Sequence, residues 1–218
     1  MENDFDVEKF LQKKEDVSTH LDDEKNKFDE LQKLFSKDSR MYFEVAKNIN
    51  GKKDGQIIFL CDPTNVTDLI VAISKRILGS GGVPVIVLTT INYKAAKKIL
   101  KEANIEDKVF LIDTVSKGIS SVVEQEKVLF VDSLRNLTQL QIKIVKLIQK
   151  EKNISFVFDA LNVLELYHSQ TIIMKFTYSI SKLLKKYKID AYYSITKASF
   201  APKFSQFFDN LVEIKKIR

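Results

Sequence analysis

The sequence predicts an α/β fold in which a mostly parallel β-sheet is covered by helices on both faces, preceded by an N-terminal helical, coiled-coil arm. Two observations lead to this prediction. From Lys52 onward, short apolar runs alternate with amphipathic stretches, which is typical of parallel strands buried on both faces. Before Gly51 there is neither proline nor glycine, and apolar residues recur at heptad spacing. We therefore expect two parts, an arm over residues 1–50 and a domain over residues 51–218.

The arm carries apolar residues at the a and d positions of one unbroken heptad pattern. Seven of nine such positions are apolar, namely Val7, Phe10, Val17, Leu21, Phe28, Leu31 and Phe35. One interpretation is a coiled coil that joins copies of the protein or docks a partner helix, so that removing residues 1–48 reduces the eluted size. The other is a helix folded back on its own domain, because Leu11, Leu34 and Met41 widen the apolar stripe.

Seven strands and four helices are expected in the domain. The strands are predicted at residues 56–60, 84–88, 109–113, 128–131, 154–158, 190–195 and 211–215, and the helices near 67–78, 92–103, 138–151 and 170–186. Thr67 and Thr138 are the predicted N-caps of the first and third helices, because a threonine hydroxyl accepts amide hydrogen bonds in a first turn. Residues 79–82 follow a helix and precede a strand, so we predict a plain turn there and not a phosphate loop.

One stretch of the domain carries a resemblance to a known family. Residues 154–159 are a buried-strand pattern that ends in Asp159, and a leucine-rich segment with a tyrosine, residues 160–167, comes before the next helix. This order resembles the second half of the RecA/KaiC-like ATPase core. Residues 109–113 and 136–140 are similar to segments of the archaeal KaiC-like proteins that lack the Walker A motif. The resemblance covers residues 56–215. It implies a RecA-like sheet with Asp159 at the Walker B position, and side-by-side packing of copies in an oligomer.

The phosphate-binding loop of ATPases with this fold is absent after the first predicted strand. A P-loop needs glycines, so that backbone amides can surround phosphates, and a lysine to neutralise them. The corresponding positions of this chain are Cys61, Asp62, Pro63, Thr64, Val66, Thr67 and Asp68. Thr67 stands where the lysine would be, and Asp62 and Asp68 would repel a triphosphate. The loop is therefore degenerate as a nucleotide site.

Two further groups that hydrolysis requires are also missing. KaiC-like enzymes have a catalytic glutamate just after the second strand, but here residues 84–88 lead into residues 89–93, which contain no carboxylate. The residue after Asp159 is Ala160, where the family has serine. We therefore predict a pseudo-ATPase with no catalytic residue, cofactor or metal. Its expected role is regulatory or scaffolding, and its N-terminal helices are expected to mediate self-association or to dock a helical partner.

Asp159 also belongs to a set of four aspartates at the ends of predicted strands. The others are Asp62, Asp113 and Asp132. Because ligands collect at the carboxyl ends of parallel strands, these side chains could form a carboxylate group that holds a divalent cation. Alternatively, each carboxylate caps its own strand end through local backbone hydrogen bonds. A binder or sensor of nucleotide that uses Asp159 at a non-standard site is thus a second function that the sequence leaves open.

Charge is divided unequally along the chain. Residues 1–50 contain 9 basic and 13 acidic side chains, whereas residues 51–218 contain 26 basic and 16 acidic ones. A basic domain is compatible with a third function, nucleic-acid binding. Against this function, the lysines cluster at helix spacing, which is more typical of a solvated helix face, and only four arginines are present for base recognition.

The remaining composition restricts the class of protein. One cysteine cannot form an internal disulfide, and two histidines argue against a structural zinc site. No apolar run has the length of a membrane span, and the first residues have no signal-peptide character. We therefore expect a cytoplasmic protein without a membrane partner.

Overall fold

The computed structural model describes residues 37–49, 55–118, 122 and 125–215. By its internal contacts the chain divides into two compact units, residues 1–40 and residues 41–218. All seven residues of the predicted coiled-coil seam lie outside the described residues, so the coiled coil stays a prediction.

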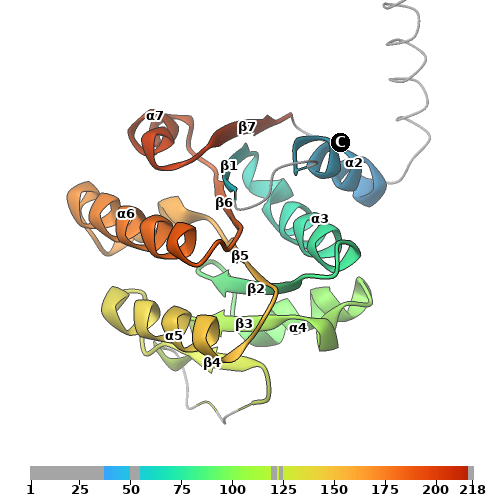
Figure 1. The fold of residues 1–218 in the computed structure, drawn as a ribbon, viewed down its shortest axis with the longest axis horizontal. Coiled ribbons are helices and arrows are strands. Elements are labelled where there is room, and N and C mark those ends of the chain that lie inside the picture. The colour runs from blue at the N-terminus through green and yellow to red at the C-terminus, as the bar shows by residue number, and fades with distance from the viewer. Residues whose placement is uncertain (1–36, 50–54, 119–121, 123–124, 216–218) are drawn as a thin grey trace, which may run out of the picture. The chain divides into compact units, whose positions relative to one another are not determined.

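A parallel sheet of seven strands forms the centre of the described chain, in the order β4-β3-β2-β5-β6-β1-β7 (Figure 1). The strands are β1 (Gln56–Cys61), β2 (Val83–Leu88), β3 (Phe110–Asp113), β4 (Val128–Phe130), β5 (Ile154–Phe158), β6 (Ala191–Ile195) and β7 (Asn210–Ile214). Each predicted strand is confirmed, with its ends shifted by no more than one residue. Strands β5 and β6 are buried along their whole length, because helices cover both faces of the sheet.

Helices cover the sheet in two layers (Figure 1). One layer contains α2 (Lys37–Ile49) from Met41 onward, α3 (Val66–Gly79) and α4 (Tyr93–Glu102), and the other contains α5 (Leu137–Lys150), α6 (Gln170–Lys186) and the short α7 (Ala201–Phe204). The apolar residues of the two layers fall into two core clusters, one for each side of the sheet. The four helices predicted in the domain are confirmed, and α7 was not predicted. None of the described helices combines the length and apolar character needed to cross a membrane.

Helix α2 joins the domain core from Met41 onward. Met41, Val45 and Ile49 recur at four-residue spacing, so they lie on one side of the helix, and all three are buried. They belong to the same core cluster as the apolar residues of α3. This packing falls within residues 1–50, the range assigned to the arm from sequence. A truncation that removes the arm and preserves the domain must therefore end before α2.

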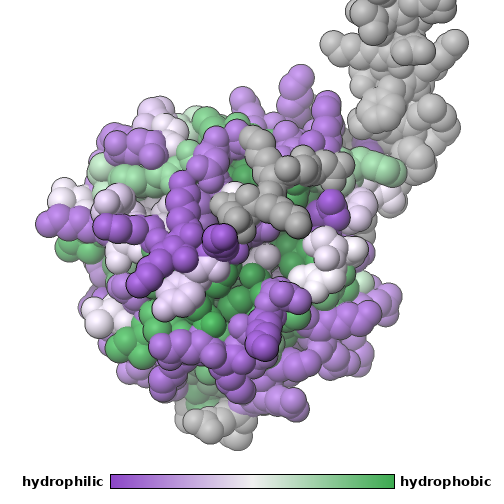
Figure 2. All heavy atoms as spheres, viewed as in Figure 1, coloured by the Kyte–Doolittle hydropathy of each residue, from purple (hydrophilic) through white to green (hydrophobic). Residues whose placement is uncertain are grey.

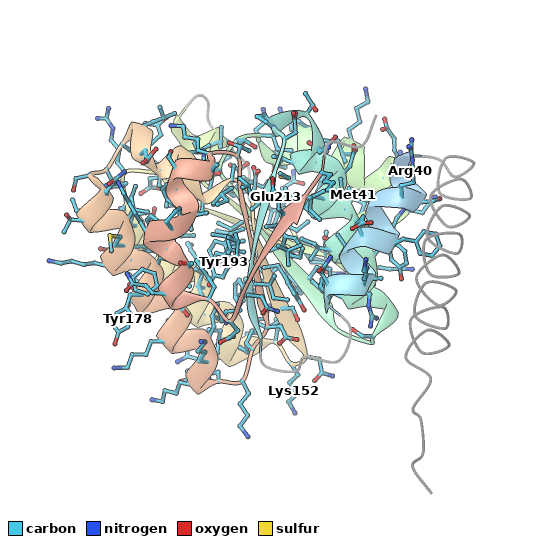
Figure 3. All side chains as sticks on the ribbon, turned by 90° about the horizontal axis from the view of Figure 1, so that it is seen from above. Arg40, Met41, Lys152, Tyr178, Tyr193 and Glu213 are labelled. Atoms are coloured by element: carbon cyan, nitrogen blue, oxygen red, sulfur yellow. The ribbon has the colours of Figure 1, made fainter. Side chains whose placement is uncertain are left out.

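A polar pair is buried between strands β1 and β6. The Tyr193 hydroxyl donates to Gln56 Oε1 at 2.9 Å, and Gln56 Nε2 donates to Ile189 O at 3.2 Å. The Tyr193 ring stacks on Phe158 with their centroids 4.6 Å apart, and it lies in the middle of the domain (Figure 3). Burial raises the pKa of Tyr193, so the hydroxyl remains protonated and keeps its role as a donor.

Asparagines, not the predicted threonines, precede helices α3 and α5. Asn136 Oδ1 accepts a hydrogen bond from Gln139 N at 2.9 Å, and Thr138 lies inside the first turn of α5. Asn65 ends a 3-10 turn that leads directly into α3, where Thr67 is the second residue. The prediction of threonine caps was therefore wrong, because each helix begins before its threonine.

The glycine cluster forms the predicted turn between α3 and β2. The amide nitrogens of Ser80, Gly81 and Gly82 donate to carbonyl oxygens in the last turn of α3, at 3.0 to 3.2 Å. Gly81 has a φ of 80°, a left-handed conformation that favours glycine. These amides terminate a helix, so they do not surround a ligand.

Candidate functional site

The connection between β1 and α3 is the place where a RecA-like fold would hold phosphates. Strand β1 passes into α3 through a single 3-10 turn, Pro63–Asn65. Asp62 Oδ1 accepts from Thr64 N at 2.9 Å and from the Thr64 hydroxyl at 2.6 Å. Asn65 N donates to Asp62 O at 2.9 Å. The amides of Thr64 and Asn65 therefore donate to Asp62 within the turn. A phosphate cradle instead needs several amides that point at the ligand.

The first residues of α3 are mostly packed into the domain. Val66 is 7% exposed and belongs to the core cluster of the α3 side. Asn65 is fully buried, and within the described residues its side-chain oxygen and nitrogen have no hydrogen-bond partner. Tyr93, the first residue of α4, is also buried, and its ring meets Phe130 edge-on with the centroids 5.2 Å apart. Tyr93 thus packs toward β4 and away from β1.

Asp159 links the end of β5 to the end of β2. Its side chain is almost fully buried, and Oδ2 accepts from Thr90 N at 3.0 Å and from the Thr90 hydroxyl. Thr89 N lies 3.4 Å from the same oxygen, and the Thr89 hydroxyl donates to the Asp159 carbonyl at 2.7 Å. Asp159 Oδ1 has no partner among the described residues. Burial raises the pKa of Asp159, and the hydrogen bonds from Thr90 and Thr89 oppose that shift only in part.

Backbone strain occurs directly after Asp159. Ala160 has a φ of 27° and a ψ of 72°, which is a sparsely populated conformation for a residue with a side chain. Ala160 N donates to Ser194 Oγ at 2.7 Å, and Ser194 Oγ also donates to Phe158 O at 3.2 Å. Strand β6 therefore helps to hold the chain in this conformation at the end of β5.

A small cavity lies beside Asp159, between α3, α4 and β2. Its volume is about 20 Å³, room for about one water molecule, whereas ligand pockets typically have several hundred Å³. Its lining is mostly apolar, with Ile70, Ile86 and Ile99 among the residues that form it, and Thr67, Thr90 and Asp159 provide the polar part. A nucleotide does not fit into this space.

Cys61 ends strand β1 and is buried. Burial, and secondarily the charges of Asp62 and Asp159, raises the pKa of the Cys61 thiol to about 12. The thiol is therefore neutral near pH 7, and it is neither a nucleophile nor a metal ligand in that state.

The four strand-end aspartates make separate contacts. Asp113 is fully buried and accepts four hydrogen bonds, from the amides of Tyr93, Val115 and Ser116 and from the Ser116 hydroxyl. Asp132 forms an ion pair with Lys117 at 3.0 Å, and hydrogen bonds from Lys117 and Gln139 lower its pKa. Asp62 and Asp159 have the contacts given above.

The sheet order puts one strand between Asp62 and Asp159 and one between Asp159 and Asp113, whereas β3 and β4, which lead to Asp113 and Asp132, are neighbours. Strand β6 lies between β1 and β5, and β2 lies between β5 and β3. Across the described ranges, no three histidine, cysteine, aspartate or glutamate residues are grouped so that they could hold a metal ion. For Asp62 the contacts match the capping alternative. Asp113 combines local bonds from Val115 and Ser116 with a bond from Tyr93 N, and both Tyr93 and Thr90, the partner of Asp159, follow β2.

The sequence interpretation did not identify the partners of Asp159. In the sequence, Thr89 and Thr90 indicate only that no carboxylate follows the second strand. Two hydroxyls directly after a buried strand are the signal that was available, but their role depends on β2 and β5 being neighbours. Ser194 was missed for the same reason, since its bond to Ala160 depends on β6 lying next to β5. The burial of Asn65 was missed as well.

A solved structure resembles this chain in fold, although no sequence comparison finds a relative. No protein-family model matches the sequence, and no curated protein matches it. Among solved structures, a KaiC-like protein from the hyperthermophilic archaeon Pyrococcus horikoshii is similar, with a TM-score of 0.56 and 14% sequence identity over 76% of this chain and 75% of that chain. A likeness at this identity concerns the fold alone. Together with the sheet order and the two helical layers, it shows that this chain has a RecA-like α/β fold.

Proposed function

We propose that this protein is a RecA-like module that does not turn over nucleotide and that acts as a regulatory or scaffolding subunit. The observation that carries the proposal is the turn from β1 into α3, in which Asp62 accepts the hydrogen bonds of Thr64. A triphosphate would meet a carboxylate and bonded amides there, and residues 61–68 include no lysine or arginine that could offset its charge. Binding energy for the phosphates is therefore lacking at the place where this fold normally supplies it.

The environment of Asp159 supports the same proposal. A Walker B aspartate serves a magnesium ion, which needs ionised oxygen ligands with free lone pairs. Here Oδ2 accepts two hydrogen bonds from Thr90, and burial favours the neutral form of the carboxyl group. The adjacent cavity of about 20 Å³ has room for about one water molecule, so it is not a nucleotide pocket.

Association through the N-terminal helices is the second part of the proposal. It is based on the heptad pattern of residues 7–35, in which apolar residues occupy seven of nine a and d positions. A coiled coil of this kind joins two copies of the chain, or this chain and a helical partner. The arm would then link the RecA-like domain to a second copy of the chain or to the helical partner.

Calorimetry and a phosphate-release assay test the first part. With ATP and magnesium, we expect no phosphate release above the buffer background and no heat of binding from ATP, ADP or cyclic dinucleotides. Asp159→Ala is the matched control, because it removes the one carboxylate at the Walker B position. ATP binding with magnesium at micromolar affinity, lost in Asp159→Ala, would contradict the proposal.

Light scattering tests the second part. The full chain is compared with a variant that lacks residues 1–36, which leaves α2 and its core contacts intact. We expect the full chain to have a mass larger than a monomer and the shortened chain to have the mass of a monomer. An unchanged mass after the deletion would contradict association through the arm.

A second candidate function is a nucleotide sensor that uses Asp159 without hydrolysis. One observation favours it, namely that Oδ1 of this buried carboxylate has no partner among the described residues. The calorimetry above distinguishes the two functions, because a sensor gives heat that disappears in Asp159→Ala.

A further inference from the structure

Strand β7 is an open edge of the sheet. It stands last in the strand order, and within the described residues it pairs with β1 alone. Alternate residues of a parallel strand bond to opposite neighbours, so every second residue of an edge strand directs its amide and carbonyl groups outward. Figure 3 looks down on this edge, and the described helices lie to either side of β7, on which Glu213 is labelled. β7 therefore presents backbone donors and acceptors to which another strand can add.

The opposite edge strand, β4, is less suited to strand addition. β4 has only three residues, and Lys127, directly before it, has a φ of 60°. Gln125 forms an antiparallel bridge with Val128 across that turn. β7 has five residues and contains neither proline nor glycine. Natural sheets protect their edges with short or kinked strands and with charges. Of these protections β7 has only the charges, which a partner of opposite sign can pair.

The side chains of β7 are divided between the two faces of the sheet. Val212 and Ile214 pack with the core cluster on the α3 side. Leu211, which is 48% exposed, and Glu213, which is also exposed, lie on the other face because alternate residues share a face. The same alternation places the exposed Lys215 after them. Along the upper rim of Figure 2, where Figure 1 shows β7, hydrophobic and hydrophilic side chains lie next to each other.

Two charges in this row are uncompensated within the described chain. Asp209, just before β7, lies 2.9 Å from Lys185 Nζ. Neither Glu213 nor Lys215 takes part in an ion pair with another described residue. A strand beside β7 would bring its own side chains directly opposite these two, at the distance where opposite charges stabilise a sheet and like charges destabilise it.

We propose that the edge of β7 binds an extended segment of a partner protein, which adds to the sheet as an antiparallel strand. Main-chain hydrogen bonds provide the affinity in this mode of recognition, and the side chains provide the specificity. The antiparallel direction follows because parallel pairing is slightly less stable per residue. The exposed row selects a segment with an apolar residue opposite Leu211, a basic residue opposite Glu213 and an acidic residue opposite Lys215.

A second copy of β7 meets these requirements poorly. Two copies would pair about a two-fold axis, and three registers pair at least three residues of β7 with one another. Centred on Leu211, the pairing brings Asp209 against Glu213, and centred on Glu213 it brings this carboxylate against its own copy. Centred on Val212, it brings the apolar Leu211 against Glu213. We therefore assign the edge to a different protein. Because β7 belongs to the unit of residues 41–218, the proposal does not depend on the N-terminal arm.

Residue-resolved amide hydrogen exchange of the full chain tests strand addition. The probe is a blocked peptide of about seven residues, with lysine opposite Glu213, glutamate opposite Lys215 and valine opposite Leu211. We expect slower exchange at every second amide of β7, because only the amides that point away from β1 gain a new acceptor. Non-specific adsorption does not produce this alternation. The same peptide with proline at its centre should give no protection, because proline lacks the amide donor.

Exchanging the two charges locates the contact. A second peptide carries glutamate opposite Glu213 and lysine opposite Lys215, and we expect it to bind about fivefold more weakly than the first. Glu213→Lys combined with Lys215→Glu should reverse this preference. The matched control, Glu102→Lys combined with Lys101→Glu, makes the same two changes on exposed residues of α4 and should keep the wild-type preference. Thermal unfolding of both variants verifies that they are folded.

Three outcomes would overturn the proposal. The first is the absence of protection at β7 with saturating peptide, and the second is a peptide preference that the β7 double variant leaves unchanged. The third is a lower mass of this variant than of wild type in light scattering, because β7 would then pair with a second copy of the chain. Failure of the arm to associate leaves the peptide measurements unaffected, so the two proposals fail separately.

Discussion

Asp113 and Asp159 are buried aspartates at the ends of β3 and β5, the strands on either side of β2, yet their hydrogen bonds differ. Asp113, at the end of β3, has donors on both oxygens and stabilises the local turn. Asp159, after β5, has donors on only one oxygen, and the other is buried without a partner in the described chain. The difference teaches that a buried carboxylate at a strand end is a structural cap only where its hydrogen bonds are complete.

Removing the Asp113 carboxylate should have the largest effect on stability. Asp113→Ala leaves the amides of Tyr93, Val115 and Ser116 without their acceptor in a buried site. We expect the free energy of unfolding to fall by about 4 kcal/mol, because several buried donors are left unsatisfied together. Urea denaturation measures this loss. A loss below about 1 kcal/mol would mean that water replaces the carboxylate, and it would contradict the role of Asp113 as a cap.

Removing the Asp159 carboxylate should cost less. Asp159→Ala leaves Thr90 N and the Thr90 hydroxyl without their acceptor, but it also removes a buried oxygen that has no partner. We expect a loss of about 2 kcal/mol in the same urea measurement. Asp159→Asn keeps an acceptor for Thr90 and should cost less than Asp159→Ala. If Asp159→Ala were as damaging as Asp113→Ala, the distinction between the two sites would be lost.

The pH dependence of stability should differ between wild type and Asp159→Asn. Burial raises the pKa of this carboxyl above its ordinary value of 3.8, so the folded protein holds the proton more tightly than the unfolded chain does. The resulting stability is complete below the unfolded pKa and is lost as the pH rises through the folded pKa. From acidic to neutral pH, wild type should therefore lose stability relative to Asp159→Asn. A gain relative to Asp159→Asn over that range would contradict the raised pKa.

The smallest effect is expected at the β1–α3 turn. Thr64 is exposed, and its amide and hydroxyl donate to Asp62. Thr64→Ala removes only the hydroxyl contact, so we expect a change below about 0.5 kcal/mol in thermal unfolding. The turn can therefore be altered without unfolding the protein, which makes it a suitable place to test nucleotide binding. A loss comparable to that of Asp159→Ala would show that this turn is a main support of the fold.

The fold was predictable because its signals are local. Strand β5 is a nearly continuous apolar run, and helix α6 repeats its apolar residues at helical spacing. A short stretch of sequence therefore predicts the secondary structure of each. The partners of Asp159 were not predictable in this way. Thr90 lies 69 residues before Asp159, and only the adjacency of β2 and β5 brings the two together. The N-caps were mistaken because Asn136 and Thr138 are both suitable caps in sequence, and only the start of the helix decides between them.

The contact between Asp159 and Thr90 has a practical consequence for protein engineering. Grafting a glycine-rich loop with its lysine between β1 and α3 would introduce phosphate ligands, but it would leave the acceptor oxygen of Asp159 occupied by Thr90. A designer who wished to create a magnesium–nucleotide centre on this scaffold would also have to replace Thr90 with a residue that lacks a hydroxyl and to enlarge the space around Ile86. The redesign therefore requires coordinated changes at the β1–α3 connection and at β2 with the residues that follow it, since the loop alone is insufficient.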